Sequence, residues 1–558
     1  MRTKDEIRRE YARWLEEAKD PELNARLREL DDAGIEDAFY QDLTFGTAGL
    51  RGVMDAGTNR MNRYTVARAS QGLANYLKER YADPSVAVAY DSRKQSEQFA
   101  RIACEVFAAN GIRVHLYREL MPTPCLSWAV RSLDCSAGVM VTASHNPAQY
   151  NGYKVYGPDG CQITTEGAEA ILGEIEKLDI FRDVVSLPFQ DAMEQGMAAW
   201  IPRKTADAYV SRVLEQSVLF GDEADRSAAI VYSPLNGTGR NPVLRALYES
   251  DFRNVAVVRE QEEPDGDFPT CPSPNPENRE AMALGLETCR RIGADLFLAT
   301  DPDCDRCGVA VRDGTEYRLL TGNEVGILLL DYICAQRSRH GKMPKDPVFV
   351  KTIVTTDLAE KIAARYGVRT VNVLTGFKFI GEVIGGLEAR GRETDYLLGF
   401  EESCGYLTGP YVRDKDGVNA VLMICEMYAR YRAQGITLPG RLEEIYREYG
   451  YSLSTVYSFA FPGYAGMREM TERMEAFRRE PPSAWGEEPV ERTLDYAGGL
   501  DGLPCADVIK YFTASASVVI RPSGTEPKLK AYISVTAPDR ERARELEQRI
   551  AAEVKARV

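Results

Sequence analysis

The segment Thr142-Ala143-Ser144-His145-Asn146-Pro147 follows an apolar run and places a hydroxyl among polar, turn-forming residues. A serine at such a turn can carry a covalent group, but its hydroxyl is a weak nucleophile that needs activation or prior modification. Ser and Asn are also good helix caps, so a simple capping turn is the alternative interpretation of this segment.

A second segment, Asp301-Pro302-Asp303-Cys304-Asp305-Arg306, also follows an apolar run. Three carboxylates at alternate positions repel one another unless a cation or a proton intervenes. Oxygen ligands favour Mg²⁺ or Ca²⁺, and Arg306 would stand beside the cation to meet an anion. An EF-hand is excluded, because its sixth position would be Arg306 and not Gly.

Two other interpretations of the aspartate segment remain open. It could be a solvated acidic turn. Asp301 could also be the nucleophile of a haloacid-dehalogenase-type phosphatase, although that family has Thr or Val where this chain has Asp305.

Two more polar loops follow apolar segments. Glu401 and Ser403 in GFEESCGY pair acceptors that could bind adjacent sugar hydroxyls, although Glu-Glu-Ser also occurs on ordinary surfaces. The segment 521–528, RPSGTEPK, combines a guanidinium, two hydroxyls and a glycine. Such a set can cradle a phosphate, and a β-turn with a surface Arg is the plainer alternative.

Composition limits the other possibilities. A length of 558 residues predicts three to four domains, and 44% hydrophobic residues supply several cores. The net charge of −15 argues against a nucleic-acid partner. No run approaches the ~18 apolar residues of a membrane span, and the charged N-terminus does not resemble a secretory signal. Twelve scattered cysteines suit reduced thiols, which predicts a cytoplasmic location.

Histidine is rare in this chain, since only His115, His145 and His340 occur. Histidine-rich metal sites are therefore excluded, and a Ser-His-Asp hydrolase would have to use one of these three. No G-x-S-x-G motif is present.

The elements that position these loops read as alternating strands and helices, which predicts α/β layers. Strands are expected at 85–90, 137–144, 229–234, 295–300, 348–354 and 396–400. Helices are expected at 93–110, 321–333, 418–435 and 539–558. Most of the chemically interesting residues follow the strands, and open α/β sheets bind ligands at strand carboxyl ends.

The four loops TASHNP, DPDCDR, GFEESCGY and RPSGTEP, with FGTAGLRG at 45–52, resemble in type and order the α-D-phosphohexomutase superfamily. The resemblance spans about residues 40 to 535 and is greatest to the branch with bacterial phosphoglucomutases and phosphopentomutase-like mammalian enzymes. This chain departs from the usual metal loop by having Pro302 and Cys304 at glycine positions.

The resemblance implies an α/β fold with four domains around a central cleft. Three would be similar mixed-sheet α/β domains, and the fourth a TATA-binding-protein-like α+β domain. The expected domains are 1–203 with the phosphoserine loop, 204–320 with the metal loop, 321–445 with the sugar loop and 446–558 with the phosphate loop.

The resemblance also implies roles for individual residues. Ser144 would be the phosphorylated serine, and Asp301, Asp303 and Asp305 would hold Mg²⁺ together with an oxygen of that group. His145 and Lys415 are the two candidate proton carriers. The residues expected to bind substrate are Arg51, Arg93, Lys154, Arg306, Thr375, Gly376, Glu401, Ser403, Arg521, Ser523, Gly524 and Thr525.

The activity implied is interconversion of glucose 1-phosphate and glucose 6-phosphate through a phosphoserine enzyme and a glucose 1,6-bisphosphate intermediate. Mannose or pentose phosphates are alternative substrates for the same mechanism. A Mg²⁺-dependent sugar-phosphate phosphatase and a non-catalytic sugar-phosphate-binding protein are the competing classes. The expected partner is a small phosphosugar, with no nucleic acid or membrane, and the oligomeric state is left open.

Overall fold

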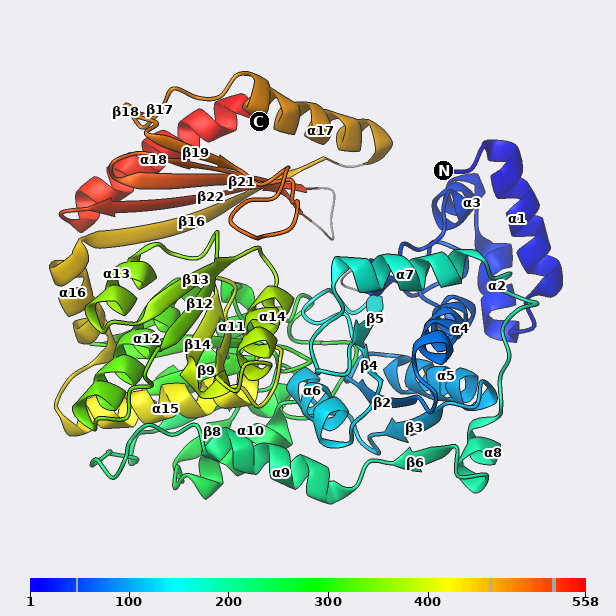
Figure 1. Ribbon diagram of the computed structural model, residues 1–558, viewed down its shortest axis with the longest axis horizontal. Helices are drawn as coiled ribbons and strands as arrows, with labels where there is room; N and C mark the ends of the chain where they lie inside the picture. Colours follow the sequence, from blue (N-terminus) through cyan, green and yellow to red (C-terminus); the bar gives the residue numbers. More distant parts are fainter. Residues whose placement is uncertain (47–48, 462, 524–527) are drawn as a thin grey trace.

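Four large sheets mark four domains. In Figure 1 the first domain lies to the right, the second and third overlap at the lower left, and the fourth lies above the third. The computed structural model describes residues 1–46, 49–461, 463–523 and 528–558, without the side chains of 463–465. The predicted segment FGTAGLRG and the predicted residues Gly524 and Thr525 therefore lie partly or wholly outside the described residues.

The first domain has a six-stranded sheet in the order β1-β5-β4-β2-β3-β6. Its strands are β1 (Leu50–Val53), β2 (Ser85–Tyr90), β3 (Arg113–Leu116), β4 (Ala137–Val141), β5 (Tyr150–Tyr156) and β6 (Ala198–Trp200). Its helices are α4 (Arg63–Arg80), α5 (Ser96–Ala109), α6 (Thr123–Ser132), α7 (Thr165–Glu176) and α8 (Phe189–Glu194). Alternate residues of β2 enter two different apolar clusters, because successive side chains of a strand point to opposite faces.

The second domain has a five-stranded sheet in the order β11-β10-β9-β7-β8. Its strands are β7 (Ile230–Ser233), β8 (Val255–Val257), β9 (Leu296–Thr300), β10 (Cys307–Asp313) and β11 (Glu316–Leu320). Its helices are α9 (Arg203–Leu214), α10 (Arg240–Glu249) and α11 (Arg279–Ile292).

The third domain has a four-stranded sheet in the order β13-β12-β14-β15. Its strands are β12 (Val348–Thr352), β13 (Arg369–Val373), β14 (Tyr396–Glu401) and β15 (Gly405–Thr408). Its helices are α12 (Gly322–Arg339), α13 (Leu358–Arg365), α14 (Phe377–Glu388), α15 (Gly417–Ala433) and α16 (Leu438–Tyr449).

These three sheets share one topological feature. In each, a strand pairs in parallel with one neighbour and antiparallel with the strand that follows it: β4 with β2 and β5, β9 with β7 and β10, β14 with β12 and β15. The loop after β4 carries Ser144, the loop after β9 carries Asp303, and the loop after β14 carries Ser403. The same switch in strand direction therefore positions the three predicted site loops.

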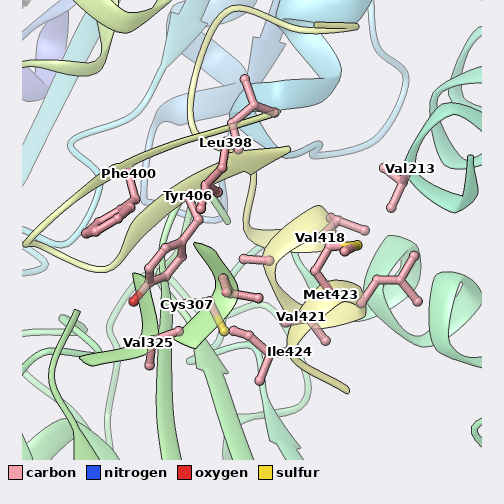
Figure 2. Close-up of a cluster of buried hydrophobic side chains, with 14 of the residues drawn as sticks. Val213, Cys307, Val325, Leu398, Phe400, Tyr406, Val418, Val421, Met423 and Ile424 are labelled. Atoms are coloured by element: carbon pink, nitrogen blue, oxygen red, sulfur yellow. The ribbon is translucent and has the colours of Figure 1, made fainter. Parts of the chain in front are cut away.

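Domains one to three share a continuous apolar core. One buried cluster extends from Ala87 of β2 to Tyr446 of α16. Figure 2 shows part of it, with Cys307 of β10, Phe400 of β14 and Val418, Val421 and Ile424 of α15. A shared core fixes the relative positions of these domains, because close-packed interiors resist displacement.

The fourth domain has an antiparallel sheet in the order β16-β22-β21-β20-β19 and its own core. Its strands are β16 (Tyr451–Ala460), β19 (Arg492–Asp495), β20 (Ile509–Phe512), β21 (Ala516–Pro522) and β22 (Lys528–Ala537), with a small pair β17 (Ala484–Trp485) and β18 (Glu488–Pro489). Helices α17 (Gly463–Arg479) and α18 (Arg540–Arg557) lie on the side of the sheet away from the third domain (Figure 1).

Successive side chains of β21 point to opposite faces of the fourth sheet, so one face packs against the helices and the other against the third domain. Val518 and Ile520 of β21 pack in the core with the helices, whereas Val519 packs against Ile353 and Leu374 of the third domain. Beside this small apolar contact, Lys510 Nζ donates to Asp357 Oδ1 at 3.0 Å. The fourth domain is thus attached to the third through a limited surface of its own.

Three helices, α1 (Lys4–Glu17), α2 (Pro21–Glu29) and α3 (Asp32–Phe39), precede the first sheet. Trp14 of α1 is fully buried and makes edge-to-face contacts with Phe39, Tyr64 and Phe181. The N-terminal helices therefore pack onto the first domain through an aromatic cluster.

The predicted strands and helices are present, with ends shifted by up to three residues except at the predicted helix 321–333, which extends to Arg339 as α12. The predicted class, three mixed-sheet α/β domains and a C-terminal α+β domain, is confirmed. The boundaries at 203, 320 and 445 stay predictions.

Candidate active site

Ser144 and Asp301 meet across the boundary between the first and second domains. The Ser144 hydroxyl donates to Asp301 Oδ2 at 2.9 Å, and both side chains are buried. The serine has a φ of 53°, in the left-handed region that few non-glycine residues adopt. Cys304 and Cys404, in the two corresponding loops, also have positive φ, at 50° and 61°. All three loops therefore turn sharply in the same sense after their strands.

The three predicted metal ligands are brought together. One carboxylate oxygen from each of Asp301, Asp303 and Asp305 lies within 4.8 Å of the others, and all three residues are buried. Asp301 Oδ1 accepts from the backbone N–H groups of Asp305 and Arg306, each at 3.0 Å, which folds the loop back on itself. This is the only group of three or more possible ligands among the described residues.

The carboxylate oxygens of this triplet fit a divalent cation. Asp303 Oδ1 and Asp305 Oδ1 have no hydrogen-bond donor within the part of the chain described. Buried carboxylate oxygens left without donors are costly unless a cation neutralises them. The triplet could therefore hold a metal ion, and its all-oxygen donors suit a hard cation.

Two lysines lie against the triplet. Lys154 Nζ donates to Asp303 Oδ2 at 2.8 Å, and Lys415 Nζ lies 2.8 Å from Asp305 Oδ2. Burial lowers the pKa of Lys415, but Asp305, Asp414 and Glu401 outweigh it and raise that pKa above its usual value. Lys415 is therefore a charged ammonium in this arrangement.

The carboxyl groups of the triplet differ in their surroundings. Burial, followed by repulsion from Asp305 and Asp303, raises the pKa of Asp301 well above its usual value. Burial also opposes ionisation of Asp303, yet Lys154, Lys415 and the Thr123 hydroxyl lower its pKa overall. The two lysines thus supply local positive charge beside the triplet within an acidic protein.

His145 lies next to the serine oxygen. Its Nδ1 is 3.3 Å from Ser144 Oγ. Burial, with the nearby Arg306 and Arg51 guanidinium groups, holds the pKa of His145 well below its usual value. The imidazole is therefore uncharged in this arrangement, whereas Lys415 is charged.

Glu401 of the predicted sugar loop is also buried. Glu401 Oε1 accepts from the backbone N–H of Gly376 at 3.0 Å, which joins the loop after β14 to the start of α14. Burial raises the pKa of Glu401 to about 7, although Lys415 opposes this shift. Thr375 Oγ1 is buried with no hydrogen-bond partner among the described residues, and Ser403 is partly exposed.

Arg51, Arg306 and Arg521 contribute guanidinium groups from three domains. Arg51 donates to Asn146 Oδ1 at 3.3 Å, and Arg306 donates to Glu277 Oε1 at 2.5 Å. Arg521 donates to the Tyr532 hydroxyl at 3.3 Å. Ser523 closes the base of its loop, where its N–H donates to the carbonyl of Lys528 at 2.7 Å.

A cavity of about 230 Å³ lies where the second, third and fourth domains meet. Its lining includes Glu277, Glu402 and Tyr532. Since Glu402 belongs to the sugar loop and Tyr532 contacts Arg521, the cavity borders both the predicted sugar loop and the predicted phosphate loop.

Arg93 was expected to bind substrate. Its side chain is fully buried and donates to main-chain carbonyls of the serine loop, including Ser144 O at 2.6 Å. The structure thus places Arg93 beside the predicted phosphoserine, and its contact with substrate stays a prediction. Asp91, whose Oδ2 accepts from the Thr142 hydroxyl of this loop at 2.6 Å, was not singled out from the sequence. Asp91 directly follows an apolar strand, the signal that identified Asp301.

Tyr156 and Asp414 were also missed. The Tyr156 hydroxyl donates to Asp414 Oδ2 at 2.7 Å, and Asp414 Oδ1 accepts from the backbone N–H of Lys415 at 2.9 Å. This contact joins residues 258 positions apart in the chain, which no local pattern shows.

The unusual Pro302 and Cys304 are accommodated by small neighbours. A Cβ on Gly237 would lie 2.4 Å from Pro302 Cα, and one on Gly417 would lie 2.7 Å from the Cys304 carbonyl oxygen. These two glycines let the loop pack closely, so the aspartates converge without glycine at 302 and 304.

Comparison with known families agrees with this arrangement. Four models for phosphoglucomutase/phosphomannomutase match successive parts of the chain: alpha/beta/alpha domain I at 42–180, domain II at 207–314, domain III at 321–449 and the C-terminal domain at 468–553. The chain belongs to this family. The predicted superfamily is thereby confirmed.

Individual members of the family resemble the whole chain. A Staphylococcus haemolyticus protein named phosphoglucomutase is 36% identical over 90% of this chain and 91% of its own length. A family protein from Burkholderia thailandensis has the same fold, with a TM-score of 0.68 and 17% identity over 92% of this chain and 97% of that one.

An Aspergillus fumigatus N-acetylphosphoglucosamine mutase, solved with GlcNAc-6P and magnesium, has a TM-score of 0.51. It is 15% identical, and the match covers 99% of each chain.

Among the described residues, no helix is long and apolar enough to cross a membrane.

Proposed function

We propose that this protein is a phosphoglucomutase, an intramolecular phosphotransferase that interconverts glucose 1-phosphate and glucose 6-phosphate. The observation that carries the proposal is the 2.9 Å contact between the Ser144 hydroxyl and Asp301 of the buried carboxylate triplet. The name of the Staphylococcus relative supports glucose over mannose or pentose phosphates.

Ser144 would carry the phosphoryl group between turnovers. In the first half-reaction the bond between phosphorus and Ser144 Oγ breaks, while a sugar hydroxyl oxygen forms the new bond to phosphorus. The hydroxyl proton passes to a base, and the product is glucose 1,6-bisphosphate. The bisphosphate then reorients, and its other phosphate returns to Ser144.

His145 is the better placed of the two proton carriers before metal and substrate bind. It is neutral and lies 3.3 Å from the serine oxygen, whereas Lys415 is charged and paired with Asp305. A base must begin the step without the proton.

Asp301, Asp303 and Asp305 would hold Mg²⁺, a choice that the oxygen donors and the magnesium in the Aspergillus mutase structure support. When bound, Mg²⁺ supplies charge neutralisation for the transferring phosphoryl group. Lys154, Arg51 and Arg306 would add positive charge around the same group.

The remaining predicted residues would bind the substrate away from the reacting phosphate. Glu401 and Ser403, with Thr375 and Gly376, would contact sugar hydroxyls. Arg521, Ser523, Gly524 and Thr525 would hold the non-transferring phosphate. The same set must accept both orientations of the bisphosphate.

An assay with Mg²⁺, glucose 1-phosphate and a trace of glucose 1,6-bisphosphate tests the proposal. Glucose 6-phosphate should form without net release of phosphate. Release of free phosphate would favour a phosphatase, and binding without turnover would favour a non-catalytic protein. Comparing kcat/KM for glucose, mannose and pentose 1-phosphates then tests the choice of sugar.

A further inference from the structure

The serine loop is held from behind by a single guanidinium. Arg93 donates to the main-chain oxygens of Ser144 at 2.6 Å, Pro147 at 2.9 Å and Tyr150 at 3.0 Å, and also to that of Asn146. Three of these acceptors belong to the loop between β4 and β5, and Tyr150 is the first residue of β5. One buried cation therefore fixes the course of the whole loop.

Asp91 holds the other side of the same loop. Its Oδ2 accepts from the Thr142 hydroxyl at 2.6 Å and lies 3.3 Å from Arg93 Nε. Its Oδ1 accepts from the Ser96 hydroxyl at 2.7 Å and from the backbone N–H of Arg93 at 3.0 Å. Both side chains of the ion pair are completely buried.

The two ends of Ser144 are tied to this pair. The Ser144 N–H donates to Thr142 Oγ1 at 2.8 Å, and the Ser144 carbonyl accepts from Arg93. The Thr142 hydroxyl therefore connects Asp91 to the backbone N–H of Ser144, while Arg93 binds the Ser144 carbonyl directly.

The serine backbone needs such support. At a φ of 53° it occupies a conformation that L-residues other than Gly, Asn and Asp rarely adopt, and such residues persist only when their surroundings over-determine them. In this conformation the hydroxyl donates to Asp301 Oδ2. A relaxed backbone would direct the oxygen elsewhere.

We infer that Asp91, Thr142 and Arg93 form a serine-loop clamp whose role is to position Ser144 against the aspartate triplet. The inference rests on the proposed function, and it gives Arg93 a positioning role instead of a substrate contact. The clamp acts on the rate of phosphoryl transfer through geometry, because small misplacements of reacting atoms cost large factors in rate.

Thr142 offers the cleanest test, since valine has nearly the same shape as threonine without its hydroxyl. Thr142→Val is expected to lower kcat at least tenfold and to change KM less than threefold. The rate at which glucose 1,6-bisphosphate phosphorylates Ser144, followed by intact mass, should fall by the same factor as kcat. Thr142→Ser keeps the hydroxyl and should recover to within threefold of wild type.

Thr288→Val, at a buried threonine of α11, is the matched control and should retain wild-type kinetics. Arg93→Lys keeps the positive charge but removes the guanidinium, which donates several hydrogen bonds at once. This variant should also lower kcat without raising KM. A Thr142→Val enzyme with wild-type kcat, or an Arg93→Lys enzyme changed in KM alone, would overturn the inference.

Crystal structures separate this inference from the proposed function. In Thr142→Val, Ser144 should leave the left-handed region and its Oγ should withdraw from Asp301. An unchanged serine would refute the clamp whatever the activity of the protein. A wild-type protein that neither turns over substrate nor forms phosphoserine would instead refute the proposed function, while the serine position would still decide the clamp.

Discussion

Ser144 of the first domain donates its hydroxyl hydrogen bond to Asp301 of the second domain at 2.9 Å, although 157 positions separate them in the chain. This contact places a possible phosphoryl carrier beside a possible cation site. It also depends on the packing of two domains, so damage to either loop should disrupt both functions.

Removing divalent cations should abolish activity, because the three clustered carboxylates of the aspartate triplet would repel an incoming phosphate. Treatment with EDTA followed by dialysis should reduce kcat at least a hundredfold, and added Mg²⁺ should restore it. Mg²⁺ at about 100 times its Kd should also stabilise the fold by about 2.7 kcal/mol.

Asp305→Asn should show the same loss of kcat. Added Mg²⁺ should no longer raise the melting temperature of this variant. Glu287→Gln, at an exposed carboxylate of α11, is the control. Full turnover after chelation would be incompatible with a metal site at the triplet.

Arg521→Ala should weaken phosphate binding. A lost charge-assisted hydrogen bond costs about 1.5–3 kcal/mol, so KM for glucose 1-phosphate should rise about 10- to 150-fold. The effect on kcat should be smaller, because this phosphate does not react. Arg479→Ala changes an exposed arginine of α17 in the same domain and should leave KM unchanged. If KM is unaffected by Arg521→Ala, the phosphate loop has been misassigned.

Activity should depend on the ionisation of Glu401. Burial raises its pKa to about 7, and only the ionised carboxylate can accept hydrogen bonds through both oxygens. The accepting form is therefore present above pH 7 and lost below it, so kcat/KM should fall as the pH drops through about 7. Glu401→Gln should be less active and should lack this step in its pH profile. A variant that keeps the same step would assign the titration to another group.

The N-terminal helices should contribute to stability. Trp14 is fully buried against three aromatic rings, and Trp→Ala in such a position typically costs about 3–5 kcal/mol. Trp14→Ala should therefore lower Tm by several degrees in calorimetry. Tyr248→Ala, at a residue that is 63% exposed, should leave Tm nearly unchanged. An unaltered Tm in Trp14→Ala would mean that the helices fold independently of the first domain.

The sequence predicted the site best where it lies in strand-to-loop transitions. Asp301 and Glu401 were recognised because a buried apolar strand gives way abruptly to carboxylates, which is unusual without a function. The same rule would have found Asp91, which follows β2 in the same manner.

The sequence could not show contacts that depend on packing between distant segments. The hydrogen bonds of Arg93 to the serine loop could not be predicted, because the type and spacing of an arginine do not tell which acceptors its guanidinium meets. The Tyr156–Asp414 contact arises from the way distant segments meet. Motif order predicted the four-domain fold, whereas these contacts require coordinates.

Intact-mass measurement of the protein after exposure to glucose 1,6-bisphosphate tests the central claim most directly, with turnover followed on the same samples. Wild type should acquire one phosphoryl group on Ser144 and lose it to glucose 1-phosphate, whereas Ser144→Ala should acquire none and show no turnover. Wild-type-like turnover in Ser144→Ala, or phosphorylation at another residue in wild type, would contradict the proposed role of Ser144.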